Sequence, residues 1–118
     1  MAELTVDGAT VTLVMTHVEH LEGFRRDLAA PLGSVVAVQA VTDPWPELRG
    51  MRAPGTGMPG VVAVGTRRGS FGKDFCAVHG KGPGVVVELE DHEFERWVLT
   101  VEHPDAVAAE VSAAAGLV

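Results

Sequence analysis

The chemistry that this 118-residue sequence could support is concentrated in the basic side chains of one glycine-rich segment. Between residues 49 and 81 the sequence holds six Lys or Arg against Asp74 alone, whereas the rest of the chain holds three basic and fifteen acidic residues. Guanidinium groups and exposed backbone amides can together bind a phosphate or a carboxylate. In the alternative interpretation, these side chains only keep a hairpin tip solvated or pair with the surplus acids. The candidate anion-binding residues are Arg49, Arg52, Arg67, Arg68 and Lys73.

The same segment carries large apolar side chains that could contact another protein. A loop rich in glycine and proline extends from Trp45 to Gly60 and separates the two halves of the chain. Trp45 stands between two prolines, where it either anchors the loop by packing or, if exposed, offers a contact to a partner. The candidate interface residues are Trp45, Met51, Met58 and Phe71.

The other reactive side chains do not form a catalytic or metal-binding set. His17 and His20 share a face of a short predicted helix, but two ligands do not make a metal site, and the His-Glu-x-x-His pattern is absent. Cys76 lies inside a predicted strand, where a cysteine behaves as a small buried hydrophobe, and His79 points to the opposite strand face. The sequence therefore favours a non-enzymatic protein without a metal or cofactor. In the competing hypothesis, a minor enzyme uses the basic hairpin as an anion clamp, with His79 as acid or base.

The composition bounds the class of protein. Hydrophobic residues make up 47% and charged residues 21%, which is typical of a globular protein, and we expect a single domain over residues 1–118. A net charge of −7 disfavours a nucleic-acid partner and an acidic membrane. The single cysteine excludes a disulfide framework, and the N-terminus lacks the basic start and apolar stretch of a signal peptide. The expected location is the cytoplasm.

Twenty valines favour a sheet-rich core as the frame for these residues, because β-branched side chains suit a pleated surface. Alternating apolar and polar residues on both sides of Asp7-Gly8 predict a hairpin over residues 4–15. A capping-box pattern predicts a short helix over residues 16–24. Short glycine-containing turns favour an antiparallel meander. The further predicted strands cover residues 27–30, 35–41, 61–66, 71–78, 85–90 and 96–101.

The last predicted element is an amphipathic helix. Pro104 suits the first helical turn, and Asp105 favours the positive end of the helix dipole. Apolar side chains at Val107, Val111 and Ala114 form one stripe. The sequence thus predicts a mainly β fold of seven to eight strands followed by one helix, which lays its stripe over an open end or face of the sheet.

Residues Ala30-Pro31-Leu32-Gly33-Ser34-Val35 form a turn into a predicted strand, and Trp97–Val107 forms a predicted strand followed by a helix start. The first segment resembles the turn into a central strand, and the second resembles the final strand and following helix start, of the bacterial pleckstrin-homology-like (PH-like) domains. The resemblance implies two antiparallel sheets packed nearly orthogonally, as a sandwich or partly open barrel, with the C-terminal helix closing one end. It implies no defined activity, because bacterial members mostly have none assigned and some assemble as oligomers. The basic pattern of phosphoinositide-binding relatives has no match in the first hairpin.

Together these observations predict a binding or scaffolding module rather than an enzyme. We expect it to act through a protein partner or through self-association, using the loop that begins at Trp45 and the basic hairpin that follows. The alternative is a protein that binds a small anionic ligand through the arginines and lysines of that hairpin.

Overall fold

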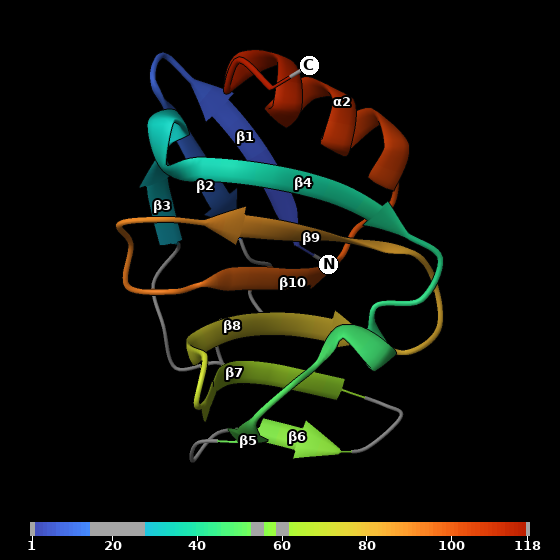
Figure 1. Ribbon diagram of the computed structural model, residues 1–118. Coiled ribbons are helices and arrows are strands. Elements are labelled where there is room, and N and C mark those ends of the chain that lie inside the picture. Colours follow the sequence, from blue (N-terminus) through green and yellow to red (C-terminus); the bar gives the residue numbers. More distant parts are fainter. Residues whose placement is uncertain (1, 15–27, 53–55, 59–61, 118) are drawn as a thin grey trace.

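The computed structural model describes residues 2–14, 28–52, 56–58 and 62–117. The helix predicted over residues 16–24, with its two histidines, lies outside the described residues. The chain is mainly β: two sheets dominated by antiparallel strand pairs pack against each other and against one C-terminal helix (Figure 1). Eight of the described strands have four or more residues. The fold class predicted from the sequence is therefore confirmed.

The smaller sheet contains β1 (Glu3–Asp7), β2 (Thr10–Val14) and β3 (Leu28–Pro31), in that order. The predicted hairpin of β1 and β2 is confirmed, but its two-residue turn begins at Gly8 rather than at Asp7, because Asp7 still pairs with Thr10. A glycine at the first position of a two-residue turn is typical of a type II′ hairpin. The turn predicted after β3 is a 3-10 helix, Leu32–Ser34, which leads into the larger sheet.

The larger sheet has seven strands in the order β4-β9-β10-β8-β7-β5, and β6 also pairs with β7. Its strands are β4 (Val35–Val41), β5 (Met51–Arg52), β6 (Thr56–Met58), β7 (Val62–Gly69), β8 (Gly72–His79), β9 (Gly84–Leu89) and β10 (Arg96–Thr100). The long strands lie at or near their predicted positions. Strands β5 and β6 were not predicted, since they are short pieces within a segment whose composition indicates a loop.

The predicted antiparallel meander is wrong in one respect. Strand β10 lies between β8 and β9 and runs parallel to β8, so β8 and β9 are not neighbours. The connection from β8 to β9 has to cross two strand spacings, roughly 9–10 Å. Residues 80–83 make this connection, and four residues can span roughly 13 Å. The four-residue connection between β8 and β9 is therefore long enough for the two strands to stand apart with β10 between them.

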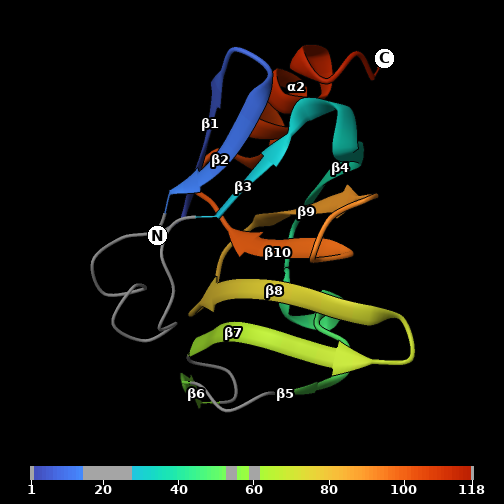
Figure 2. The ribbon, with the colours of Figure 1, turned by 90° about the vertical axis from the view of Figure 1, so that its left-hand side faces the viewer.

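The main hydrophobic core lies between the two sheets, whose strands cross at a steep angle (Figures 1 and 2). Trp97, Phe75 and Phe94 are the largest fully buried side chains. The rings of Phe75 and Phe94 meet edge to face, with their centroids 5.7 Å apart. Leu4 and Leu13 of the smaller sheet close the core from the other side. Burying a leucine or phenylalanine side chain stabilises a fold by about 1.5–3 kcal/mol.

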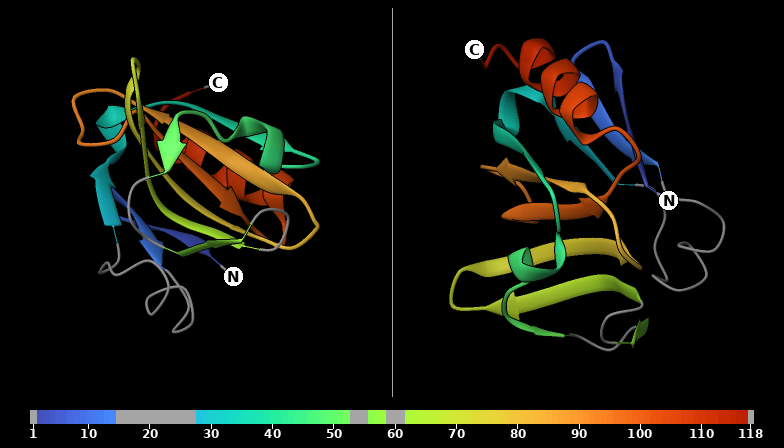
Figure 3. Two further views of the ribbon diagram at one scale, coloured as in Figure 1. Left: turned by 90° about the horizontal axis from the view of Figure 1, so that it is seen from below. Right: turned by 90° about the vertical axis from the view of Figure 1, so that its right-hand side faces the viewer.

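Helix α2 (Pro104–Ala114) confirms the predicted C-terminal helix. It lies against β4 and also contacts β1 and β9, at one end of the two sheets (Figure 3). Val111 is fully buried and Val107 is half-buried, as the predicted stripe requires, whereas Ala114 is exposed. Helix α2 has eleven residues, and no helix in the described part of the chain could cross a bilayer.

The end of α2 explains why Leu117 rather than Ala114 completes the apolar stripe. The N–H of Leu117 donates to the carbonyl of Ser112 at 2.8 Å, and the N–H of Gly116 donates to the carbonyl of Ala113 at 3.2 Å. These two bonds form a Schellman motif, which needs a residue with positive φ, and Gly116 has a φ of +77°. The motif turns the chain back so that Leu117 packs against the core.

The buried face of α2 gives a test of this architecture. In Val111→Asp a charge replaces a fully buried methyl pair, and we expect the free energy of unfolding to fall by at least about 3 kcal/mol. In the control, Ala109→Asp, the same charge is added at an exposed position of the same helix, and a change within about 0.5 kcal/mol is expected. Urea unfolding followed by circular dichroism measures both. Equal losses in the two variants would contradict the packing of α2 on the sheets.

Candidate functional site

The larger sheet is covered on both faces, by the smaller sheet on one and by residues 42–50 on part of the other. We call these residues the strap. The strap leaves β4, forms the 3-10 helix Trp45–Glu47, and passes in front of β8 and β7 to reach β5 (Figure 1). Trp45 and Leu48 pack on a second cluster of buried side chains, which consists of Ala63, Cys76, Val78, Val86 and Val98. The first part of the predicted loop is therefore packed against the sheet.

Trp45 anchors the strap at one end. Its side chain is half-buried, and its indole Nε1–H donates to the carbonyl of Gly80 at 2.6 Å. Its backbone N–H donates to the carboxylate of Asp43 at 3.1 Å, which closes a short turn ahead of the 3-10 helix. Of the two roles that the sequence left open for Trp45, these contacts support packing of the loop.

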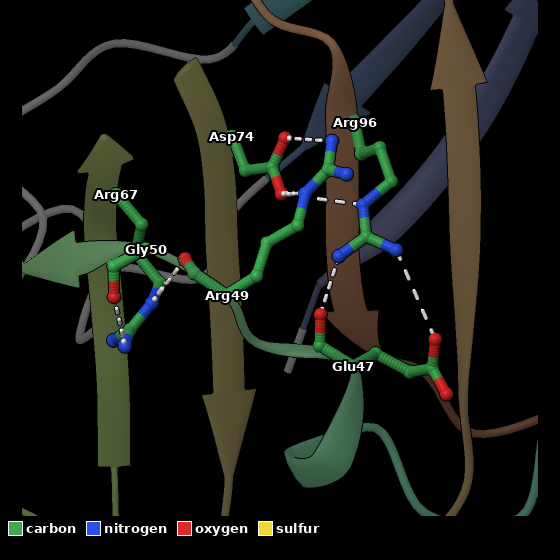
Figure 4. Close-up of polar contacts among 6 residues, drawn as sticks. All are labelled: Glu47, Arg49, Gly50, Arg67, Asp74 and Arg96. Atoms are coloured by element: carbon green, nitrogen blue, oxygen red, sulfur yellow. Dashed lines mark hydrogen bonds and ion pairs between the residues drawn. The ribbon is translucent and has the colours of Figure 1, made fainter. Parts of the chain in front are cut away.

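The other end of the strap is held by a buried carboxylate that two arginines share (Figure 4). Asp74, on β8, is 1% exposed. Arg49 of the strap donates to it from Nε at 2.7 Å and from Nη2 at 3.1 Å, and Arg96 of β10 donates from Nε at 3.2 Å. Arg96 also donates to the backbone carbonyl of Glu47 and lies 3.8 Å from the Glu47 carboxylate. The hydrogen bonds to Asp74 raise the pKa of Arg49 above its ordinary value.

A second set of contacts fixes the strap to the hairpin of β7 and β8. Arg67 donates from Nε to the carbonyl of Arg49 and from Nη2 to the carbonyl of Gly50, both at 3.0 Å. The Arg49 guanidinium carbon lies 3.9 Å from the centre of the Phe71 ring. Gly50 has a φ of +80°, and a Cβ atom there would lie 2.5 Å from the Arg68 carbonyl oxygen. Only glycine fits this crossing without strain.

These contacts show where the structure places the candidate anion-binding residues. Arg49 and Arg67 lie side by side, but their donors point at a carboxylate and at backbone carbonyls of the same chain. Lys73 pairs with Glu93 at 3.1 Å. Arg68 lies on β7 and is exposed to solvent. Arg52 lies in β5, and its side chain is outside the described part of the structure, as is that of Met58 in β6.

Three residues that organise this region were not among the predicted site residues: Glu47, Asp74 and Arg96. Asp74 had a signal, because it is the only acidic residue between residues 49 and 81. A single acid among six basic residues, at a position inside a predicted strand, is a candidate partner for one of them. Arg96 had no such signal, since its pairing with Asp74 depends on the parallel neighbourhood of β10 and β8.

The described apolar side chain most open to solvent lies at the end of the same hairpin. Met51 is 81% exposed, and its Cα is paired with that of Arg68, so the two side chains lie on one face. Phe71 lies in the turn between β7 and β8 and is half-buried against the strap. We call Met51, Arg68 and Phe71 the hairpin tip.

Cys76 behaves as a buried hydrophobe in the second cluster. It is 2% exposed, and its Sγ lies 3.4 Å from the carbonyl oxygen of Gly65. Burial raises the pKa of the Cys76 thiol to about 11. A thiol with this pKa holds almost no reactive thiolate at neutral pH. Within the described residues no three His, Cys, Asp or Glu side chains are grouped as metal ligands.

Removing the charge of Asp74 tests whether it holds the strap. In Asp74→Asn the two guanidinium groups lose their countercharge while the side-chain volume is kept, and we expect a loss of about 3 kcal/mol of unfolding free energy. Glu110→Gln is the control, because Glu110 is an exposed carboxylate of α2 outside this network, and its expected effect is within about 0.5 kcal/mol. Urea denaturation measures both. Similar stabilities of Asp74→Asn and the wild type would show that the strap does not depend on this charge.

The raised pKa of Cys76 predicts a pH dependence of stability. The folded chain binds the thiol proton more tightly than the unfolded chain does, where the pKa is about 8.5. This contribution is therefore fully present below the unfolded pKa and is lost as the pH rises towards the folded value of about 11. In Cys76→Ala, unfolding free energy should fall less steeply over this interval than in the wild type. Urea unfolding at a series of pH values measures the two slopes, and equal slopes would contradict the burial of a neutral thiol.

Comparison with known proteins identifies no relative of this chain, so a function has to be inferred from the geometry. No protein-family model matches the chain, and neither a curated protein nor a solved structure matches it. The described site is a strap held on a sheet by Trp45, by the Asp74 network and by Arg67, with the hairpin tip next to it.

Proposed function

We propose that the protein is a non-enzymatic binding or scaffolding module that acts through protein–protein contacts at the hairpin tip. The observation that carries this proposal is Met51, which is 81% exposed beside an exposed arginine, Arg68. Burying a methionine side chain is worth about 1.5–3 kcal/mol, so its exposure leaves free energy that a partner could recover. Methionine and arginine are also enriched at protein interfaces relative to the rest of a protein surface.

The contacts beneath the tip support this proposal, because they order the tip before any partner arrives. Arg67 and Arg49 tie β5, β7 and β8 together through carbonyl and carboxylate acceptors. Phe71 lies against Arg49 and next to Gly50, so the turn is packed on its own strap. A surface that is already ordered loses less side-chain and loop entropy on binding.

The alternative function, capture of a small anion, would need guanidinium donors that are free to bind it. Arg49 and Arg67 already donate to Asp74 and to the backbone of the strap, and Lys73 already pairs with Glu93. Arg68 offers one exposed guanidinium at the tip. The geometry therefore supports the protein-contact function more strongly than the anion clamp.

We also propose that the chain is a bacterial PH-like domain that acts in the cytoplasm. Two sheets with a C-terminal helix over one end support the PH-like assignment. The parallel pairing of β8 with β10 departs from the purely antiparallel sheets that the resemblance implies.

Photo-cross-linking in the cells that make the protein tests the proposed function. A photo-reactive amino acid replaces Ser70, which is exposed in the turn of the hairpin, and leaves Met51 and Arg68 in place. The control places the same group at Gln39, an exposed position of β4. We expect defined protein cross-links from position 70, none from position 39, and loss of the former when Arg68→Glu is added.

The outcome that contradicts the proposed function is a pattern of cross-links that is the same at both positions, or none from position 70. Native mass spectrometry of the purified protein tests the anion alternative in parallel. A reproducible small extra mass that is lost in Arg68→Ala, together with no cross-links from position 70, would favour the anion clamp.

A further inference from the structure

A pocket of about 240 Å³ lies between the start of β1 and the beginning of α2. Its apolar lining comes from Ala2, Leu4, Val101 and Val107. Its volume corresponds to that of roughly eight water molecules in the liquid, which is enough room for a methionine side chain. Water in such a pocket is displaced at little cost by an apolar group.

The rim of this pocket carries two carboxylates and one imidazole. Glu3, Glu102 and His103 line it and are exposed to solvent, and His103 Nε2 lies 4.0 Å from the Glu102 carboxylate. The two carboxylates outnumber the imidazole, so the rim is acidic overall. The two carboxylates stand beside the apolar lining, in the same way that Arg68 stands beside Met51 at the hairpin tip. The tip therefore presents an apolar side chain with a positive neighbour, and the pocket presents an apolar cavity with negative neighbours. The two surfaces are complementary, because an apolar side chain matches an apolar cavity and a positive charge matches negative ones.

The pocket and the hairpin tip lie at opposite ends of the strands. Strands β8 and β10 run parallel, and the hairpin tip is at the beginning of β8, whereas Val101 and Glu102 follow the end of β10. The left view of Figure 3 shows the turn between β7 and β8 on the side of the molecule opposite the N-terminus. A chain cannot place its own Met51 in its own pocket, but a second copy can.

We infer that the partner of the hairpin tip is a second copy of this chain, whose pocket between β1 and α2 receives Met51 while its acidic rim faces Arg68. This inference rests on the proposed function and names its partner. The contact joins two different surfaces. In a pair of copies, one therefore keeps an unused tip and the other an unused pocket, so further copies can add head to tail into a chain or close into a ring. The chain's uneven charge, basic between residues 49 and 81 and acidic elsewhere, favours this arrangement over a contact of like surfaces.

The expected association is weak, because one apolar side chain and one charged pair make a small interface. We expect a dissociation constant on the order of 100 µM, since interfaces below the standard size are usually transient. Sedimentation velocity of the wild-type protein over a concentration series around that value should show a sedimentation coefficient that rises with concentration. Added salt should weaken the association, because charged rims are screened.

Two variants separate the two halves of the contact. The tip variant carries Met51→Ala with Arg68→Ala, and the pocket variant carries Glu3→Arg with Glu102→Arg. All four positions are exposed, and thermal unfolding checks that both variants keep the wild-type fold. We expect each variant alone to self-associate at least about tenfold more weakly than the wild type. A mixture of the two restores one tip and one pocket, so it should form a complex of one copy of each and nothing larger.

Val36→Ala is the matched control, because Val36 is the other large apolar side chain that is strongly exposed among the described residues, at 47%. It lies on β4 and belongs to neither the pocket lining nor the hairpin tip, so its loss should leave the association unchanged. The inference is overturned by a wild type that stays monomeric, by variants that associate like the wild type, or by a mixture without a complex. If it is overturned while position 70 still cross-links to a different protein, the proposed function stands with another partner. If position 70 gives no cross-links either, both fail.

Discussion

The carboxylate of Asp74 joins three segments that lie far apart in the sequence: β8, β10 and the strap. It lies on β8, and its two guanidinium partners come from positions 25 residues before it and 22 residues after it. A buried carboxylate without partners is strongly disfavoured, so the fold that buries Asp74 must also bring Arg49 and Arg96 to it. Such a network adds little net stability compared with apolar packing, but it tolerates only a narrow range of positions. Its effect here is to locate the strap, and through Arg49 the hairpin beyond it.

The strap changes the nature of the larger sheet. An antiparallel sheet often has one face in water, and its strands then alternate between apolar and polar residues. In β8 and β9 the pattern is different: Phe75, Cys76, Ala77 and Val78 are all buried, as are Val85, Val86 and Val87. These runs are apolar on both faces because the smaller sheet covers one face and Trp45 and Leu48 of the strap cover the other. Strand β9 shows where this cover ends, since Glu88 on its strap side is exposed.

The sequence predicts the elements better than it predicts their neighbours. Valine content and short-range alternation locate the long strands and α2, because these signals depend on residues close together in the chain. The position of β10 beside β8 depends on pairing between strands far apart in the sequence, and residues close together in the chain do not predict it. The basic segment shows the same limit. Counting charges identifies Arg49 and Arg67 as unusual, but only the fold shows that their acceptors are Asp74 and the carbonyls of residues 49 and 50. Met51, by contrast, is a candidate interface residue because it is a large apolar residue in this segment. Its exposure follows from its position on the short strand β5, which the sequence does not predict.

The insertion of β10 between β8 and β9 has a consequence for how the chain acquires this structure during synthesis. The ribosome makes β4, β7, β8 and β9 before β10, yet β10 is the strand that joins the pair β4-β9 to the group containing β7 and β8. Until it emerges, the nascent chain has two separate sheet fragments, each with an unpaired edge next to the vacant central place. Such edges are sites of non-native pairing. The molecule is therefore most vulnerable to aggregation between the synthesis of β9 and that of β10, and release of the residues around Trp97 ends that interval by supplying both the central strand and the largest side chain of the core.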